Sequence, residues 1–282
     1  MTTISIASGK GGTGKTTVAV SLALSRSGGQ LLDCDVEAPN AHLFLHPKIE
    51  FSEPVYTPVP LVDEDRCTLC GACADLCQFK AIAVLPEAIL TFPELCHGCG
   101  GCMAVCPEGV IQETGRELGV VERGRRGDLA FLHGRMRVGE AMAPPLIKKV
   151  REAAAPDLDT VIDAPPGASC PVMAAIHGTD VVVLVTEPTP FGLNDLELAV
   201  GAVRTLNIPH GIVINRADLG DRRVWEFADR EEIPILLEIP FDREIAEAYS
   251  RGDALVAARP EYLEKFQELG ERAEALARGG VR

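Results

Sequence analysis

The sequence predicts an α/β protein, in which a mostly parallel sheet has helices on both faces and carries a small inserted α+β unit. Continuous runs of Val, Ile and Leu alternate with longer helical stretches, which is typical of strands buried on both faces of a parallel sheet. Eight of the ten cysteines fall in two short runs, which sets that stretch apart as a separate unit. The 282 residues suffice for one large domain plus such an insert.

Apolar runs and helical periodicity place the elements of the larger domain. Residues 46–62 contain four prolines and have the composition of a linker. Residues 113–140 are expected to form two or three strands joined by a turn at 123–128. The apolar side of the last helix is expected to pack on its own domain. The expected strands are 3–7, 30–33, 159–163, 180–185, 211–214 and 235–240, and the expected helices begin at residues 18 and 144 or span 191–206 and 261–277.

Composition excludes several classes of function. The formal net charge of −14 argues against broad nucleic-acid binding, which depends on positive charge that displaces counterions. No apolar run approaches the ~20 residues of a membrane-spanning helix, so no membrane insertion is expected. The chain begins directly with a strand and a loop, which leaves no room for a signal peptide and predicts a cytoplasmic protein. In that reducing compartment, ten cysteines indicate metal binding rather than disulfides.

A glycine-rich loop follows the first strand. Residues 8–17, SGKGGTGKTT, contain the spacing Gly9-x4-Gly14-Lys15-Thr16 ahead of an apolar helical run. Glycines let the backbone turn several N–H groups inward, and the positive end of the following helix completes an anion cradle. Lys15 is expected to contact the β- and γ-phosphates of a nucleotide, and the Thr16 hydroxyl is expected to bind Mg²⁺. The predicted nucleotide-binding residues of the loop are Gly9, Gly11, Gly12, Thr13, Gly14, Lys15, Thr16 and Thr17.

A second lysine in this loop narrows the class. With Lys10 ahead of GGTGKT, the loop resembles the deviant phosphate-binding loop of the MinD/ParA/Mrp ATPases and of the nitrogenase iron protein. The resemblance implies a P-loop NTPase fold, Mg²⁺-dependent hydrolysis of ATP to ADP, and a homodimer, or a heterodimer with a related ATPase, in the ATP-bound state. It also implies that Lys10 reaches across that dimer to the partner's nucleotide, and that Lys10, Lys15 and Asp35 are the catalytic residues.

Two acidic segments resemble the switches of the same ATPases. Asp35 follows the strand at 30–33, and the resemblance implies that its carboxylate orients the water that attacks the γ-phosphate. Such a role requires a side chain at the carboxyl end of a strand near the phosphate loop, where open α/β sheets bind their ligands. The neighbouring Asp33 and Glu37 are expected to be solvated residues of this first switch.

The second switch is the segment from Asp163 to Gly167, DAPPG. The resemblance implies that Asp163 reaches Mg²⁺ through a water molecule, because Mg²⁺ keeps much of its hydration. It implies further that the Gly167 N–H senses the γ-phosphate, that Asn215 hydrogen-bonds the adenine, and that the loop at 240–242 closes over the base. Cys170 is expected to be a packed small residue near this switch.

The inserted unit carries two cysteine runs of the same spacing. Cys67-x2-Cys70-x2-Cys73-x3-Cys77 is followed by Cys96-x2-Cys99-x2-Cys102-x3-Cys106 and a proline. The runs resemble a bacterial two-cluster ferredoxin, in which the fourth cysteine of each run ligates the other cluster. The resemblance implies two [4Fe-4S] clusters, for which soft thiolate ligands are suited; zinc bound by four cysteines is the alternative. The implied ligand sets are Cys67, Cys70, Cys73 and Cys106 for one cluster, and Cys77, Cys96, Cys99 and Cys102 for the other.

The two resemblances together divide the chain. Residues 1–57 and 114–282 are expected to form the ATPase domain, and residues 58–113 the ferredoxin-like insert. Short strands at 81–84 and 109–112 are expected to flank the clusters. Because the insert lies between the two switches in the sequence, coupling between nucleotide and clusters is plausible.

The resulting interpretation is an ATP-binding and ATP-hydrolysing iron–sulfur protein that couples nucleotide-dependent dimerisation to electron transfer with an unidentified redox protein. Two alternatives stay open. An iron–sulfur cluster carrier of the Mrp type would use a late Cys-x-x-Cys pair, whereas no cysteine follows Cys170. A MinD- or ParA-like positioning ATPase with a redox-sensing module would need a membrane- or DNA-binding surface, for which the acidic last helix gives no support.

Overall fold

The computed structural model describes residues 1–279, in which strands and helices alternate along most of the chain. The strands are β1 Thr3–Ala7, β2 Gln30–Asp33, β3 Lys48–Val62, β4 Ile82–Val84, β5 Ile89–Thr91, β6 Ile111–Arg126, β7 Leu129–Met136, β8 Thr160–Asp163, β9 Val181–Thr186, β10 His210–Asn215 and β11 Ile235–Ile239. Within residues 1–279, nine of these form one sheet in the order β11-β10-β9-β1-β8-β2-β7-β6-β3. Neighbours from β11 to β7 run parallel, whereas β6 is antiparallel to both β7 and β3. The predicted α/β class with a mostly parallel sheet is confirmed.

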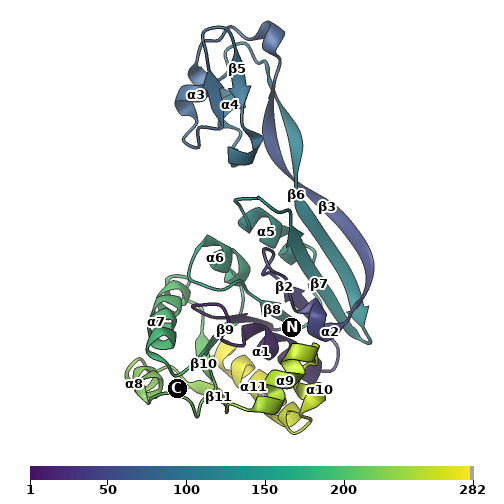
Figure 1. Ribbon diagram of the computed structural model, residues 1–282, viewed down its shortest axis with the longest axis vertical. Coiled ribbons are helices and arrows are strands. Elements are labelled where there is room, and N and C mark those ends of the chain that lie inside the picture. The colour runs from purple at the N-terminus through teal and green to yellow at the C-terminus, as the bar shows by residue number, and fades with distance from the viewer. Residues whose placement is uncertain (280–282) are drawn as a thin grey trace.

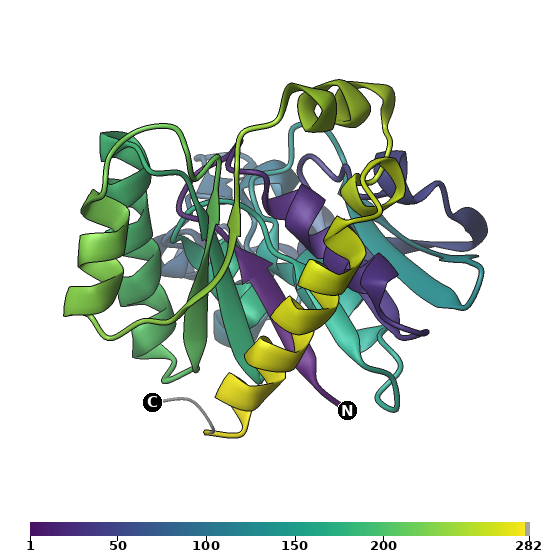
Figure 2. The ribbon, with the colours of Figure 1, turned by 90° about the horizontal axis from the view of Figure 1, so that it is seen from below.

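Helices cover both faces of this sheet (Figure 2). The helices of the described chain are α1 Lys15–Ser25, α2 His42–Leu45, α3 Ala72–Leu76, α4 Gly101–Val105, α5 Pro144–Glu152, α6 Cys170–Ile176, α7 Pro190–Thr205, α8 Arg223–Arg230, α9 Arg243–Arg251, α10 Leu255–Ala258 and α11 Tyr262–Ala277, of which α3 and α4 lie away from this sheet. One apolar core lies between the sheet and α5 to α8, and a second lies between the sheet and α1, α2, α10 and α11. In the part of the chain that the structure describes, no helix is both long and apolar enough to cross a membrane.

Strand β9 shows why continuous apolar runs predict a sheet covered on both sides. Val182 and Leu184 belong to the core under α5 to α8, whereas Val181, Val183 and Val185 belong to the core under α1 and α11. Successive side chains of a strand point to opposite faces, so a strand with helices on both faces needs an apolar residue at every position. The predicted strand at 180–185 follows from this pattern.

Strands β3 and β6 leave the sheet together as a two-stranded ribbon (Figure 1). The pairing of β6 with β7 ends at Gly119, whereas its pairing with β3 continues as far as Ile111 opposite Val62. The free part of the ribbon, residues 56–62 and 111–118, is called the stalk below. At ~3.4 Å per residue in an antiparallel pair, the stalk extends ~27 Å beyond the sheet.

The expectation of a linker at 46–62 was wrong, because β3 occupies most of this segment. Pro54, Pro58 and Pro60 lie within β3, which within residues 1–279 is the outermost strand of the sheet and pairs only with β6. A proline cannot donate to a sheet, but on an edge strand its missing N–H can face away from the neighbouring strand. The prolines therefore mark an edge strand and leave no free edge donor at their positions.

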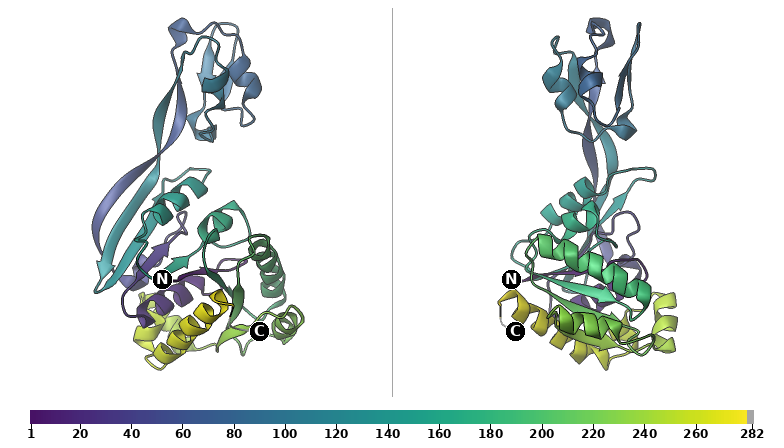
Figure 3. Two further views of the ribbon diagram at one scale, coloured as in Figure 1. Left: turned by 180° about the vertical axis from the view of Figure 1, so that it is seen from behind. Right: turned by 90° about the vertical axis from the view of Figure 1, so that its left-hand side faces the viewer.

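The stalk carries residues 63–110 as a separate unit, called the head (Figures 1 and 3). The head contains the short helices α3 and α4 and the hairpin of β4 and β5, around a small core that includes Ile82 and Ile89. The predicted strand at 81–84 is confirmed by β4. The strand expected at 109–112 is instead the beginning of the long strand β6.

The segment after the head forms two strands, β6 and β7, as expected, but their turn was placed too early. Arg123 to Arg126 belong to β6, and the turn is at Gly127 and Asp128. The two expected domain boundaries, after residues 57 and 113, fall inside the strands of the stalk. The division of the chain at those residues stays a prediction.

We expect Phe266→Ala to lower the free energy of unfolding by about 3–5 kcal/mol, because it leaves a cavity under α11. The Phe266 side chain is fully buried in the core that α11 shares with α1. Leu263→Ala, on the same helix but at a side chain that is 41% exposed, is the control and should cost little. Urea unfolding followed by the single tryptophan measures both. Equal losses in the two variants would contradict the packing of α11.

Candidate functional site

The glycine-rich loop follows β1, in the middle of the sheet, and connects it to α1 at the C-terminal ends of the parallel strands. Gly12 and Gly14 have φ angles of 83° and 91°, which side-chain-bearing residues rarely adopt. A Cβ at Gly14 would also lie only 2.3 Å from Nδ2 of Asn215. That amide donates a hydrogen bond of 2.8 Å to the carbonyl oxygen of Thr13. The predicted adenine residue and the predicted phosphate loop are therefore in contact, although they are far apart in the sequence.

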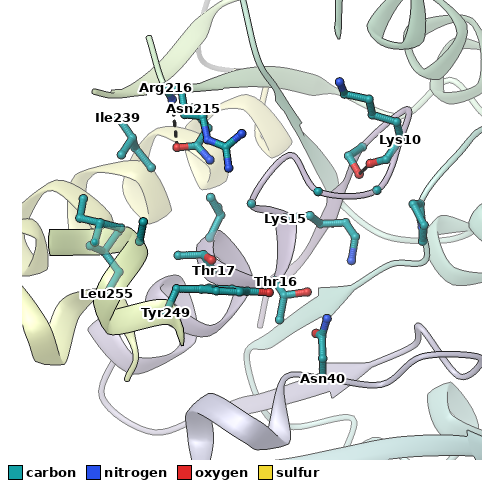
Figure 4. Close-up of a pocket in the computed structure, with 18 of the residues that line it drawn as sticks. Lys10, Lys15, Thr16, Thr17, Asn40, Asn215, Arg216, Ile239, Tyr249 and Leu255 are labelled. Carbon is teal, nitrogen blue, oxygen red and sulfur yellow. Dashed lines mark hydrogen bonds between the residues drawn. The ribbon is translucent and has the colours of Figure 1, made fainter. Parts of the chain in front are cut away.

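A pocket of about 470 Å³ opens beside this loop (Figure 4). Its size and its polar loop on one wall suit a nucleoside polyphosphate. Gly9, Thr13, Asp163 and Gly167 lie outside its lining. The predicted site residues that line the pocket are Lys10, Gly11, Gly12, Gly14, Lys15, Thr16, Thr17, Asp35 and Asn215.

The wall opposite the loop contains residues that the sequence analysis missed. Besides the expected loop at 240–242, Tyr249 from α9 and Leu255 from α10 line the pocket (Figure 4). Tyr249 also packs against Phe44 of α2, with 4.7 Å between ring centroids. The available signal was Asp242, whose carboxylate accepts a hydrogen bond of 2.8 Å from the Glu244 N–H at the start of α9. An aspartate at such a position predicts a helix.

Lys15 is buried and forms an ion pair with Asp163, the last residue of β8. Burial opposes the lysine charge, but the attraction of Asp163 outweighs burial and raises the pKa of Lys15. Among residues 1–279, Oδ2 of Asp163 and the Thr13 hydroxyl are buried without a hydrogen-bond partner. Buried polar atoms without partners are costly. A Mg²⁺–nucleotide, which would supply partners for both, fits this arrangement of residues.

The expectation that Asp33 is solvated was wrong. Its carboxylate is fully buried and accepts hydrogen bonds of 3.0–3.1 Å from the backbone N–H groups of Asp35, Asn40 and Ala41. Burial, assisted by the charge of Asp163, raises the pKa of Asp33 to about 7. Asp33 thus holds the loop that carries Asp35 in a folded-back shape.

Asp35 is half-buried and faces the pocket, as its predicted role requires. Burial raises the pKa of Asp35 to about 6, although the nearby Lys15 charge acts in the opposite direction. Glu37 is exposed, as expected. At neutral pH Asp35 can therefore be ionised, with a carboxylate able to accept a proton from a hydrogen-bonded water.

Lys10 and Lys15 leave the loop in opposite directions (Figure 4). Nζ of Lys10 lies 3.7 Å from Oε2 of Glu187, whose Oε1 accepts a hydrogen bond of 2.6 Å from Arg216. Glu187 therefore gathers two cations at the rim of the pocket. The role of Lys10 across a dimer stays a prediction.

In the second switch, the predicted role of Gly167 gains a condition and the expectation for Cys170 was wrong. The Gly167 N–H donates a hydrogen bond of 2.8 Å to the carbonyl oxygen of Ser8, so it can sense a phosphate only if this bond breaks. Cys170, expected to be packed, is exposed at the start of α6. A helix that begins with Cys170 and Pro171 places its first residues outside the core, which starts at Val172.

In the head, the eight cysteines surround two separate cavities. Each cavity is lined by three cysteines of one run and the fourth of the other run, as the ferredoxin resemblance implies. Within residues 1–279, no three His, Cys, Asp or Glu side chains converge closely enough to hold a single metal ion. The roles as ligands stay predictions. One cavity is lined by Cys67, Cys70, Cys73 and Cys106, and the other by Cys77, Cys96, Cys99 and Cys102.

Backbone N–H groups point toward sulfur atoms of the head. The Ala81 N–H lies 3.3 Å from Sγ of Cys77, and the Gly98 N–H lies 3.4 Å from Sγ of Cys96. Backbone hydrogen bonds, led by that of Val110, also lower the pKa of Cys106. Such bonds stabilise negative charge on sulfur. Two sets of four thiols with these donors fit one iron–sulfur cluster each.

A parallel sheet with a glycine-rich anion cradle after β1, and acidic residues at the ends of neighbouring strands, defines a P-loop nucleotide-binding protein. Residues 4–256 match the model of the CobQ/CobB/MinD/ParA nucleotide binding domain, and the chain belongs to this family. Two uncharacterized proteins of Methanocaldococcus jannaschii are similar to this chain over nearly their whole length. MJ0578 is 30% identical over 95% of this chain and 95% of its own, and MJ0579 is 26% identical over 98% of this chain and 97% of its own. The septum site-determining protein MinD from Pyrococcus horikoshii, solved with Mg-ADP, shares the fold. The comparison covers 100% of this chain and 99% of the MinD chain, with 21% identity and a TM-score of 0.58.

Two curated proteins match shorter parts. An iron–sulfur cluster carrier protein of Aquifex aeolicus is 31% identical over 116 residues, 36% of this chain and 32% of the carrier. The polyferredoxin protein MvhB of Methanothermobacter thermautotrophicus is 35% identical over 52 residues, 18% of this chain and 12% of the polyferredoxin.

We expect Asp33→Asn to gain stability relative to the wild type as the pH rises from about 4 to about 7. Below the ordinary pKa of an aspartate, ~3.9, Asp33 is neutral in both the folded and unfolded wild type. Above it the unfolded chain ionises first, whereas the folded carboxyl ionises only near its pKa of about 7. The folded wild type therefore loses stability across this window, and the variant does not.

Urea unfolding of both proteins across this pH range measures the difference in their unfolding free energies. Asp229→Asn, at an exposed position on α8, is the control and should show no comparable trend. A difference between Asp33→Asn and the wild type that is constant with pH would show that the buried carboxyl is ionised throughout.

Proposed function

We propose that this protein binds and hydrolyses Mg-ATP at the glycine-rich loop, holds two [4Fe-4S] clusters in its head, and couples nucleotide-dependent dimerisation to electron transfer with a redox protein. One observation carries the proposal. The eight cysteines of the head line two cavities as two complete sets of four, and the head is continuous with the sheet of the nucleotide-binding domain. The sequence similarity to a polyferredoxin supports the electron-transfer part.

In the nucleotide half, each role falls to a residue in a suitable position. The backbone N–H groups of the loop and Lys15 bind phosphate oxygens, and the Thr16 hydroxyl binds the Mg²⁺ that accompanies them. The unpartnered Oδ2 of Asp163 lies on the buried side, where it can accept a hydrogen bond from water bound to Mg²⁺. Asp35 holds the attacking water in line with the γ-phosphate. Asn215 and the loop at 240–242 enclose the base.

In the dimeric state, a homodimer or a heterodimer with a related ATPase, Lys10 exchanges Glu187 for the phosphates of the partner's nucleotide. Both are cation–anion contacts, so the exchange retains a counterion for Lys10. Its present contact with Glu187 is 3.7 Å long and partly exposed, which makes it weak.

In the head, clusters bound by the cysteine sets would supply one-electron redox chemistry. The head stands on the side of the sheet where the pocket opens. Met136, at the C-terminal end of β7, pairs with Gly119 at the foot of the stalk. Because β7 is parallel to β2 and β8, their C-terminal ends face the same side as the stalk. A partner subunit that docks at the C-terminal ends of these strands would contact the head of the neighbouring subunit.

Delivery of iron–sulfur clusters is a second candidate function. The similarity to the Aquifex cluster carrier favours it, and so does the exposed Cys170 beside the second switch. Incubation of the cluster-loaded protein with an apo-ferredoxin distinguishes the two. Transfer of clusters that is accelerated by Mg-ATP and lost in Cys170→Ser supports the carrier, whereas clusters that stay bound through many rounds of reduction support electron transfer.

We expect Asp35→Ala to bind Mg-ATP normally but to hydrolyse it about 100-fold or more slowly, because the attacking water loses its oriented acceptor. Lys15→Ala should abolish binding, since among residues 1–279 no other lysine or arginine that lines the pocket is buried. Glu37→Ala, which removes an exposed carboxylate two residues away, is the control. Phosphate release and calorimetric titration with Mg-ATP measure the two steps. Unchanged turnover in Asp35→Ala would remove this residue from the mechanism.

We expect Cys73→Ser to lose one of two clusters, so that iron falls from about eight to about four atoms per chain. The variant should still bind Mg-ATP, because no cysteine of the head lines the nucleotide pocket in the described chain. Cys170→Ser, outside the head, should keep both clusters. Iron analysis and electron paramagnetic resonance of the anaerobically reduced protein measure the content. Zinc in place of iron in the wild type would overturn the proposal and restore the zinc alternative.

A further inference from the structure

A row of polar side chains crosses the sheet from the nucleotide pocket to the strands of the stalk. Asp163 on β8 lies opposite Asp33 on β2, and Asp33 lies opposite His133 on β7. His133 in turn lies opposite Glu122 on β6, which lies opposite Ser52 on β3. Residues directly opposite each other point to the same face of a sheet. These five residues, called the polar row below, therefore line the face that α1 and α2 cover.

The half of the row nearest the stalk is hydrogen-bonded. Nε2 of His133 lies 2.8 Å from Oε2 of Glu122, and the Ser52 hydroxyl donates a bond of 3.3 Å to Oε1 of the same carboxylate. His133 is only 3% exposed. Because a carboxylate only accepts, Nε2 of His133 carries the proton in this bond and Nδ1 is left as an acceptor.

The first switch joins the two halves of the row. Asp33 accepts hydrogen bonds of 3.0 Å from the N–H groups of Asn40 and Ala41, which lead directly into α2. The next residue, His42, places its ring 5.3 Å from the ring of His133, measured between centroids. Movement of the switch loop around a nucleotide would therefore move His42 against His133.

Two further contacts attach the same segment to the strands beside the stalk. The Met136 N–H donates a bond of 2.9 Å to the carbonyl oxygen of Val36, and Arg126 donates one of 3.2 Å to the carbonyl oxygen of Phe44. The segment from the first switch to the end of α2 is thus bonded at both ends to β6 and β7. Strand β6 continues to Ile111 at the head, although its register with β3 shifts at Leu118.

The contact between the two histidines is incomplete. Nδ1 of His42 and Nδ1 of His133 are both buried, and neither has a hydrogen-bond partner among residues 1–279. Burial lowers the pKa of both rings, which favours their neutral forms. Two neighbouring imidazoles, each with a buried ring nitrogen that makes no hydrogen bond, form an arrangement that a small shift of α2 can change.

We propose that His42, His133 and Glu122 are positioning residues that transmit the state of the first switch to the stalk, and so link nucleotide binding to the redox state of the head. This inference rests on the proposed function. A direct electrostatic effect of the nucleotide on the head is weak, because salt screens charges beyond ~8 Å, far less than the stalk length. A contiguous set of packed and hydrogen-bonded groups with two arrangements is the physical alternative.

The test compares the dissociation constant for Mg-ADP between the oxidised and the dithionite-reduced protein. By linkage, any effect of nucleotide on reduction of the head equals the effect of reduction on nucleotide affinity. In the wild type we expect the two constants to differ by about fivefold or more. In Glu122→Gln and in His133→Phe we expect them to be equal, with both clusters still bound and the affinity of the oxidised protein retained.

Two further variants separate transmission from simple loss of structure. His133→Gln keeps an N–H that can donate to Glu122 and should recover part of the difference. His210→Phe is the matched control, because Nε2 of His210 on β10 is also buried without a partner in the described chain, but the residue lies outside the polar row. It should keep the full difference. A purely structural role would weaken nucleotide binding in both redox states equally.

The outcomes distinguish the inference from the proposed function. A wild type without nucleotide binding or without clusters would overturn the proposed function and, with it, this inference. Equal constants in the oxidised and reduced wild type would overturn the coupling. A wild-type difference that persists in both Glu122→Gln and His133→Phe would leave the proposed function intact and overturn the role of the polar row.

Discussion

The buried ion pair of Lys15 and Asp163 determines how the nucleotide side of the protein is built. A buried lysine charge is stable only beside an opposite charge, so β8 must end at the phosphate loop and deliver Asp163 there. Asp33 and Asp35 lie nearby, and three carboxylates then face one buried cation. Mg²⁺ would relieve this excess of negative charge, which explains why a metal–nucleotide complex suits the site better than free nucleotide.

The second constraint is the distance between the two sites. A stalk of ~27 Å keeps the head away from the pocket, so neither site shares a residue with the other. This separation protects the nucleotide fold from the geometric demands of eight cysteines, and the head can be lost or altered without removing a strand from the parallel sheet. It also means that coupling within one chain passes through β3 and β6, the strands that connect both parts.

The parallel sheet with its helices and the two sets of four cysteines could be predicted from the sequence, because both depend on the local spacing of residues. Buried parallel strands require uninterrupted apolar runs, and cluster ligands keep a fixed spacing that is set by the cluster itself. Asp33 could not be predicted, because its burial depends on N–H groups of a loop that folds back over it. Strand β3 could not be predicted, because its prolines indicate a linker. They are tolerated because β3 is an edge strand, and the sequence alone does not show that position. The pocket wall at Tyr249 carries no motif, and its place depends on how α9 packs.

The position of the insert in the strand order gives the two sites a short connection despite their separation. The head is inserted after the first switch and before β7, so its two strands are added at the sheet edge next to β7. Only β7 then lies between β2, which ends at Asp33, and β6, which leads to the head. An insert beside β11, at the opposite edge, would place β11, β10, β9, β1 and β8 between the stalk and β2. At the edge where the insert lies, a single strand, β7, separates the first switch from the stalk. On this strand His133 lies opposite Asp33 of β2 on one side and opposite Glu122 of β6 on the other.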